Sequence, residues 1–110
     1  MIARISSAIV PHSLFDKYSA YLHASAIPIY EIAEGLVSVS VFQRPVVGYV
    51  ELLTFTVWQS EAALTRFLED RPATNNERND YGVIHTEPHV YELVASRQGA
   101  RQIAEDLQAE

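Results

Sequence analysis

The alternation of apolar and polar positions is clearest between Gly48 and Asp70, where a strand with two apolar sides runs into a helix. Successive side chains of a strand point to opposite faces of its sheet. One side of this strand carries Tyr49, Leu53, Phe55 and Val57, and the other carries Val50, Leu52, Thr54, Thr56 and Trp58. Such a strand needs cover on both faces of its sheet. The chain has helices for one face only, which predicts that a second copy of the protein covers the other.

Three further segments are predicted to be strands. Residues 1–10 place isoleucines and a valine among small residues, and residues 36–44 alternate valine with serine after a turn at Gly35. In the second of these segments Val37, Val39 and Val41 are expected to share one face. Residues 83–94 supply the last strand, and Pro88 within it predicts a bulge or a sheet edge because proline cannot donate to the ladder.

The two predicted helices lie between these strands. The first begins at Ser13, where Asp16 three residues later resembles a capping box, and Pro28 is predicted to close or kink it. The second begins after Ser60, whose hydroxyl can accept a free amide hydrogen of the first turn. Residues 71–80 break all periodicity and are predicted to form a loop.

The predicted order of elements is therefore βαββαβ, within a single domain. A chain of 110 residues with 48% hydrophobic content is long enough to bury one core. We expect this domain to span residues 1–94. Residues 95–110 follow as a weakly amphipathic helical tail, in which Gly99 lowers helix stability by about 1 kcal/mol relative to alanine.

Composition and charge narrow the classes of partner. The chain has 14 acidic and 8 basic residues, a formal net charge of −6, and no basic cluster, so nucleic acid and anionic membranes are poor partners. The absence of cysteine excludes disulfides, thiol catalysis and thiolate metal sites. No segment has the length of a membrane span, and the first residues lack the apolar core of a signal peptide, so the expected location is cytoplasmic.

The sequence resembles the antibiotic biosynthesis monooxygenase-like family of the dimeric α/β-barrel superfamily. The features that carry the resemblance are the opening MIARI, the Gly35 turn before LVSVSV, the run LLTFTVWQSEAALTRF and the closing PHVYELV, which together span residues 1–94. The resemblance implies an α+β, ferredoxin-like βαββαβ fold with an antiparallel sheet that pairs with a second copy into a dimeric barrel. Some similar proteins oxidise polyketide-like aromatics with dioxygen and no cofactor, and some degrade haem.

The resemblance also points to particular residues. Cofactor-free members have a tryptophan at the end of the third strand, which Trp58 matches, and an arginine that Arg78 matches by its distance along the chain. Thr54 and Leu64 stand where those enzymes have an asparagine and a tyrosine. The asparagine, tryptophan and histidine of haem-degrading members correspond to about Ile5, Phe67 and Glu77, so that constellation is missing. We therefore expect no haem, flavin or metal cofactor.

Each candidate residue also has a simpler structural interpretation. Trp58 could stack on a planar substrate or fill the core, and Thr54 and Thr56 could bind a ligand carbonyl or reflect ordinary strand propensity. His85 and His89 could supply a general base or part of a metal site, because histidine titrates near neutral pH, but no third ligand is obvious nearby. The simpler interpretation, which we favour, is that both are partly exposed strand residues. Tyr18 could reach the space between helices and sheet, although aromatic residues at its spacing are usually core.

Two functional hypotheses follow. In the first, the protein is a cofactor-independent monooxygenase for a small planar organic substrate. Trp58, Thr54, Thr56 and Tyr18 would then bind the substrate, Arg78 would stabilise its negative charge, and His85 would be the base. In the second, the protein is a non-catalytic dimeric module that binds a small ligand or serves as a scaffold. Both hypotheses place the pocket between the helices and the sheet, with residues 71–85 as its lid.

Overall fold

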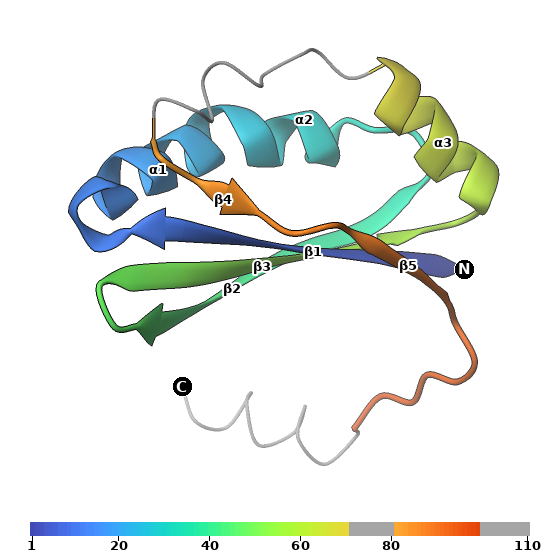
Figure 1. The fold of residues 1–110 in the computed structure, drawn as a ribbon. Coiled ribbons are helices and arrows are strands. Elements are labelled where there is room, and N and C mark those ends of the chain that lie inside the picture. The colour runs from blue at the N-terminus through green and yellow to red at the C-terminus, as the bar shows by residue number, and fades with distance from the viewer. Residues whose placement is uncertain (71–80, 100–110) are drawn as a thin grey trace, which may run out of the picture.

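The protein folds into one layer of helices on one antiparallel sheet, seen in a computed structural model that describes residues 1–70 and 81–99 (Figure 1). The strand order is β2-β3-β1-β4, with β5 also paired to β1, and all the pairings are antiparallel. This arrangement confirms the predicted α+β, ferredoxin-like architecture. The strands are β1 Ile2–Pro11, β2 Leu36–Val46, β3 Tyr49–Trp58, β4 Ile84–His85 and β5 His89–Glu92.

The helices cover one face of this sheet, and no helix of residues 1–70 and 81–99 covers the other face (Figure 1). The first helical rod is assembled from four consecutive pieces, and the second is a single helix after β3. Their bounds are η1 His12–Leu14, α1 Phe15–Tyr21, η2 Leu22–Ala26, α2 Ile27–Glu31 and α3 Glu61–Asp70.

The first helical rod differs from the prediction at both ends. It begins with a 3₁₀ turn at His12, and no side chain caps η1 or α1, so the predicted capping box at Ser13 is wrong. Pro28 does not close the helix, which continues to Glu31. The reason is the π-helical segment η2, where the backbone widens and the Ile27 amide bonds to the Leu22 carbonyl five residues back. This change of register puts Pro28 in the first turn of α2, where a missing amide hydrogen costs little.

The start of α3 matches its prediction. The Ser60 hydroxyl accepts a hydrogen bond of 3.1 Å from the Ala63 amide, and Glu61 lies in the first turn. Ala63 and Leu64 are buried, and Phe67 and Leu68 pack against them. The helix is therefore held to β3 by the stripe that its sequence pattern predicts.

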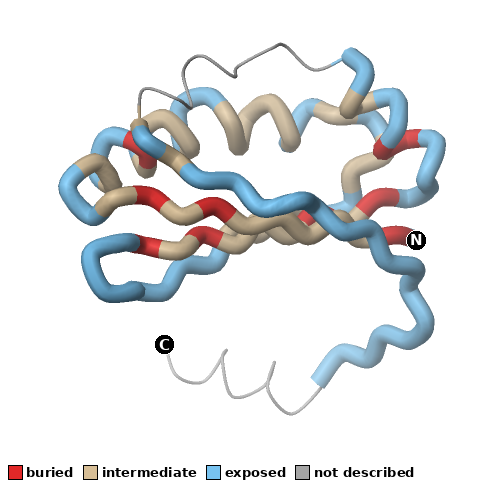
Figure 2. The backbone as a smooth tube through the Cα atoms, viewed as in Figure 1, coloured by how far each residue is buried: buried red, intermediate tan, exposed pale blue. Residues whose placement is uncertain are grey.

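The core lies between the helices and the facing side of β1 and β3, where the buried positions concentrate (Figure 2). Along β3 the helix-facing residues Val50, Leu52, Thr56 and Trp58 are buried, as the alternation predicts. The opposite side of β3 remains partly or fully exposed within one chain. It belongs to a wide apolar surface, which we call the open face, whose most exposed members include Phe42, Val46, Tyr49, Ile84 and Tyr91.

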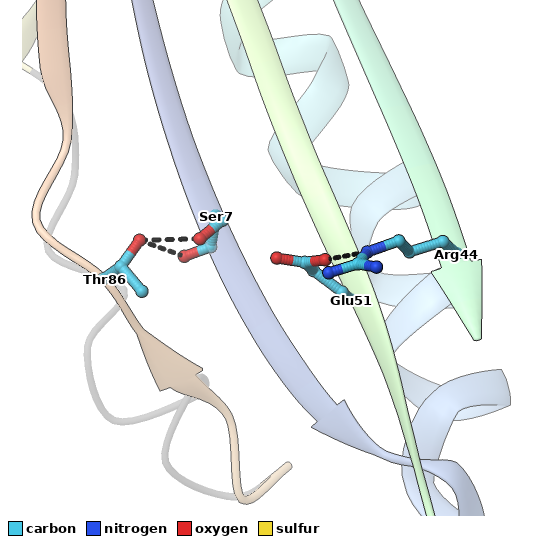
Figure 3. Close-up of polar contacts among 4 residues, drawn as sticks. All are labelled: Ser7, Arg44, Glu51 and Thr86. Carbon is cyan, nitrogen blue, oxygen red and sulfur yellow. Dashed lines mark hydrogen bonds and ion pairs between the residues drawn. The ribbon is translucent and has the colours of Figure 1, made fainter. Parts of the chain in front are cut away.

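Strand β2 is less regular than its valine and serine alternation predicts. Leu36 pairs with Trp58 and Ser38 pairs with Val57, so Val37 is an extra residue in a β-bulge. Val37 is consequently 46% exposed, and the expectation that it shares a face with Val39 and Val41 is wrong. Near the hairpin an ion pair joins Arg44 to Glu51 across β2 and β3 (Figure 3).

The last predicted strand is divided into β4 and β5, with Pro88 between them, which confirms that this proline marks an irregularity at the edge of the sheet. Residues 95–99 have no regular secondary structure. The predicted tail helix falls mainly on residues 100–110, outside the described part of the chain.

Candidate functional site

A cavity of about 280 Å³ lies between the helical rod and the helix-facing side of the sheet. Its volume is close to the lower end of the range of roughly 300–1,000 Å³ for small-molecule sites. Strands β1 and β3 form its floor, the helices form its roof, and the edge segment 85–88 forms one rim. Its principal lining residues are Arg4, Ser6, Ala8, Tyr18, Tyr21, Tyr30, Leu52, Thr54, Phe67 and His85.

Aromatic rings wall the cavity at two places. Tyr18 and Tyr21 line the cavity, and with Tyr81, which is not a lining residue, they form a triangle whose ring centroids are 5.5 to 5.8 Å apart. Tyr18 is buried and also packs against Val10 and Leu52, so the structure supports both its core role and its predicted place in the pocket. Elsewhere the ring of Tyr30 stacks on that of Phe67 at 5.0 Å. Aromatic side chains at these positions favour a flat, partly apolar ligand.

The floor of the cavity carries a polar strip. Neighbouring strands place Ser6 opposite Thr54 and Arg4 opposite Thr56, and the side chains of Arg4, Ser6 and Thr54 line the cavity. Over residues 1–70 and 81–99 no carboxylate pairs with the Arg4 guanidinium. Thr54 thus lines the pocket, as the sequence predicts, and its hydroxyl can bind a ligand there.

Arg4 is a charged lining residue that is not among the site residues predicted from the sequence. The signal was present, because Arg4 falls on the same side of the first strand as Ile2, Ala8 and Val10, all of which are buried. A charged residue in the apolar phase of a strand is uncommon unless it has a partner or a ligand.

His85 lies at the rim of the cavity, on β4 directly opposite Ala8 of β1. Its neighbour Thr86 holds this segment to β1 by several bonds (Figure 3). The Thr86 amide donates to the Ser7 carbonyl at 3.0 Å, and the two hydroxyls lie 2.6 Å apart. The edge strand is short, so these bonds help to fix the backbone from which the His85 side chain extends.

Trp58 and Thr56 do not line the cavity. Trp58 has 0% exposure, its Nε1 donates to Thr56 Oγ1 at 2.9 Å, and its ring lies 5.0 Å from that of Phe67. Thr56 Oγ1 in turn donates to the Arg4 carbonyl at 3.3 Å. The hypothesis that Trp58 and Thr56 touch the substrate therefore does not fit the geometry. Both residues are core groups behind the pocket, where they support Phe67 and the backbone of Arg4.

Two other predicted features lie apart from the cavity. Arg78 and most of the predicted lid fall in residues 71–80, outside the described part of the chain. His89 lies on β5 opposite Ile5 and lines a second, shallow hollow on the open face rather than the main cavity. Within residues 1–70 and 81–99 no group of three or more histidine or carboxylate side chains is placed to hold a metal ion.

The cavity differs from the rest of the molecule in charge. The protein carries 14 acidic residues, yet no Asp or Glu among residues 1–70 and 81–99 lines the cavity. The lining does include Arg4, and His85 can add a second positive charge when it is protonated. The part of the pocket formed by described residues is thus neutral to positive, in a protein that is acidic as a whole.

Comparisons with known proteins identify the fold. No protein-family model matches the sequence, and no curated protein matches it either. Solved structures do match. One is a protein from Deinococcus radiodurans, provisionally described as an antibiotic biosynthesis monooxygenase. It aligns with a TM-score of 0.73 and 13% sequence identity, over 89% of this chain and 97% of its own. A point mutant of MhuD, solved with two manganese protoporphyrins per active site, has a TM-score of 0.65 at 18% identity over 90% of this chain and 100% of its own.

SnoaB from Streptomyces nogalater, described as a cofactor-independent oxygenase, has a TM-score of 0.54 at 14% identity over 90% of this chain and 96% of its own. In the part of this chain that is described, no helix is long and apolar enough to cross a membrane. The three structural alignments cover most of each chain at low sequence identity. The protein therefore has the fold of the antibiotic biosynthesis monooxygenase-like proteins, in agreement with the resemblance in its sequence.

Proposed function

We propose that the protein is a cofactor-independent oxygenase for a small planar substrate with an acidic C–H or O–H group, such as a quinol-like or polyketide-like aromatic. The observation that carries this proposal is the cavity between helices and sheet, which combines aromatic walls with a histidine at its rim. Solved proteins of the same fold include one described as a cofactor-independent oxygenase, which supports this choice of chemistry.

In the proposed reaction His85 acts as the general base and removes a proton from the ring-bound methylene of the substrate. The resulting carbanion transfers electrons to dioxygen and forms a bond to one of its oxygen atoms. Cleavage of the O–O bond then leaves a carbonyl on the substrate, and the second oxygen atom departs as water with the two methylene hydrogens. Dioxygen accepts all the electrons, so the step requires no further reductant or cofactor. A positioned base contributes roughly 10²- to 10⁴-fold to such a proton transfer.

Arg78 remains a candidate for stabilising the carbanion, as the resemblance implies. The aromatic walls would hold the ring, with Tyr18 on one side and the Tyr30 and Phe67 pair on another, while Thr54 would bind a substrate oxygen. The enclosed side of the cavity would limit access of water to the carbanion.

The burial of Trp58 favours a second candidate function, a non-catalytic module that binds a small ligand. The tryptophan that similar oxygenases share is sealed in the core here, and Thr54 replaces their asparagine. Such a module would use the same cavity and the same polar floor without turnover.

Under either function we propose a homodimer that pairs the open faces of two sheets. The open face carries Leu53, Phe55 and Val57 of β3 and the exposed Phe42 of β2. Exposed apolar patches of more than a few hundred Å² are uncommon on soluble monomers, and a twofold axis would let the same patch cover itself.

The direct test of the proposed function is aerobic incubation of the protein with a panel of quinol-like and anthrone-like aromatics, followed by mass spectrometry. Oxygen insertion that is lost in His85→Gln supports the oxygenase. Binding of these compounds in the cavity without any oxygenated product supports the ligand-binding module instead.

A further inference from the structure

We propose that the cavity selects planar aromatic carboxylates, with Arg4 as the residue that recognises the carboxylate. This inference rests on the proposed function for the location of the pocket, and it adds the class of ligand.

The charge of the lining points to an anion. Arg4 is partly buried on the floor of a cavity that no acidic side chain of the described residues lines, in a chain whose net charge is −6. A cation taken partly out of water needs a counter-charge, and the described residues offer Arg4 none. An anionic ligand would supply it, and the pairing would be screened by salt less than a pairing at the open surface.

The neighbours of Arg4 suit a carboxylate in particular. Guanidinium binds carboxylate through two parallel N–H donors. The hydroxyls of Ser6 and Thr54 lie on the same floor, at the next inward-facing position along β1 and β3, and can donate to the remaining carboxylate lone pairs. The stacked rings of Tyr30 and Phe67 also line the cavity and can hold the ring that carries the carboxylate.

The backbone of Arg4 is held in place by core residues that do not line the cavity. Thr56 donates to the Arg4 carbonyl, and Trp58 donates to Thr56, so a fully buried pair of side chains holds the backbone from which the guanidinium extends. A recognition group on a rigid strand is positioned more accurately than one on a loop.

The spacing along β1 separates Arg4, which would bind the carboxylate, from His85, which would remove the proton. His85 lies opposite Ala8, four residues from Arg4, which is about 14 Å along a strand at ~3.4 Å per residue. Even with the reach of an arginine side chain, Arg4 and His85 would bracket a ligand of two fused rings rather than share one group. The carboxylate would therefore lie at one end of the ligand and the acidic C–H at the other.

The test uses 2-naphthoate and 2-naphthamide, which have nearly the same shape and differ in charge. Isothermal titration calorimetry at neutral pH measures both affinities for the intact protein. We expect naphthoate to bind at least about tenfold more tightly than naphthamide, as charge-assisted hydrogen bonds to a partly buried arginine imply. Arg4→Gln should bring this ratio close to one, and Arg4→Lys should retain part of it.

The matched control is Arg66→Gln, which removes the same charge from an exposed position on α3 and should leave the ratio unchanged. Equal affinities in the unmodified protein, or a ratio that survives Arg4→Gln, would overturn the proposal. The first of these outcomes decides the matter even if Arg4→Gln does not fold. Neither compound has an oxidisable methylene, so their affinities are measured independently of turnover. A preference for naphthoate in a protein that oxygenates none of the quinol-like and anthrone-like aromatics would leave this inference standing and remove only the proposed reaction.

Discussion

The indole Nε1 of Trp58 donates a hydrogen bond of 2.9 Å to the hydroxyl of Thr56, and both side chains are buried. The Thr56 hydroxyl in turn donates to the carbonyl of Arg4 on the neighbouring strand. The pair therefore connects the core to the floor of the cavity without facing the cavity itself. This arrangement assigns Trp58 a positioning role instead of direct contact with a ligand.

Thr56→Val tests that role, because it preserves side-chain shape and removes the acceptor. The buried Trp58 N–H would lose its partner, so we expect the free energy of unfolding to fall by about 1–3 kcal/mol. Urea denaturation, monitored by tryptophan fluorescence, measures this free energy. Thr65→Val, at an exposed position of α3, is the control and should change stability by less than about 0.5 kcal/mol. A Thr56→Val variant as stable as this control would contradict the assigned role.

Gly35→Ala should be more harmful than Gly48→Ala. Both glycines have positive φ, +87° and +78°, so each substitution incurs backbone strain. At Gly35 the added methyl would also lie 2.5 Å from Cβ of Ala63 on α3, whereas at Gly48 it meets nothing within 4 Å. Thermal unfolding of the two variants measures the difference, which we expect to be at least about 1 kcal/mol. Equal losses of stability would show that α3 can shift to make room.

Phe42→Lys tests the proposed dimer. Phe42 is 57% exposed in one chain, so the substitution should spare the monomer fold while placing a charge in the paired open faces. In sedimentation velocity at micromolar concentration we expect the unmodified protein to be a dimer of 12.3 kDa chains and the variant to be largely monomeric. Ile32→Lys, at a residue 85% exposed at the end of α2, should remain dimeric. A monomeric unmodified protein would rule out the proposed assembly.

Thr86→Val should lower turnover without abolishing binding. The substitution removes the hydroxyl contacts with Ser7 while the backbone bond from Thr86 remains, so His85 would be held less firmly beside β1. We expect kcat to fall several-fold with the affinity for naphthoate nearly unchanged, since misplacement of a catalytic group by about 1 Å is enough to slow a reaction. An equal loss of affinity and turnover would instead indicate that the whole rim has collapsed.

The fold could be predicted from the sequence because its strongest signals are periodic. The alternation along β3 predicts which of its side chains face the helices, and the apolar stripe of α3 predicts which of its side chains face the sheet. Both predictions agree with the structure. Predictions failed where tertiary context changed the local pattern. Pro28 is accommodated by a π-helical turn, and a bulge at Val37 shifts the phase of β2. Neither feature has a signature in the residue pattern.

The candidate site could be predicted only in part. Thr54, Tyr18 and His85 line the cavity, since their faces follow from strand and helix periodicity. Trp58 does not line the cavity. The alternation of the strand predicts which face of the sheet Trp58 is on, but it does not predict that Phe67 packs over the indole ring. Arg4 was missed for a different reason. Its position in the apolar phase of β1 is visible in the sequence, but the motif around Trp58 indicates Arg78 as the cation instead.

The most direct test of the proposed oxygenase is a turnover experiment in ¹⁸O₂ with the metal-free protein and a planar methylene substrate that carries a carboxylate. We expect a product with one ¹⁸O atom in its new carbonyl, formed at least about 100-fold more slowly by His85→Gln and at an unchanged rate by His89→Gln. A product that takes its oxygen from water, or no product from a substrate that demonstrably binds, would contradict the proposed oxygenase function.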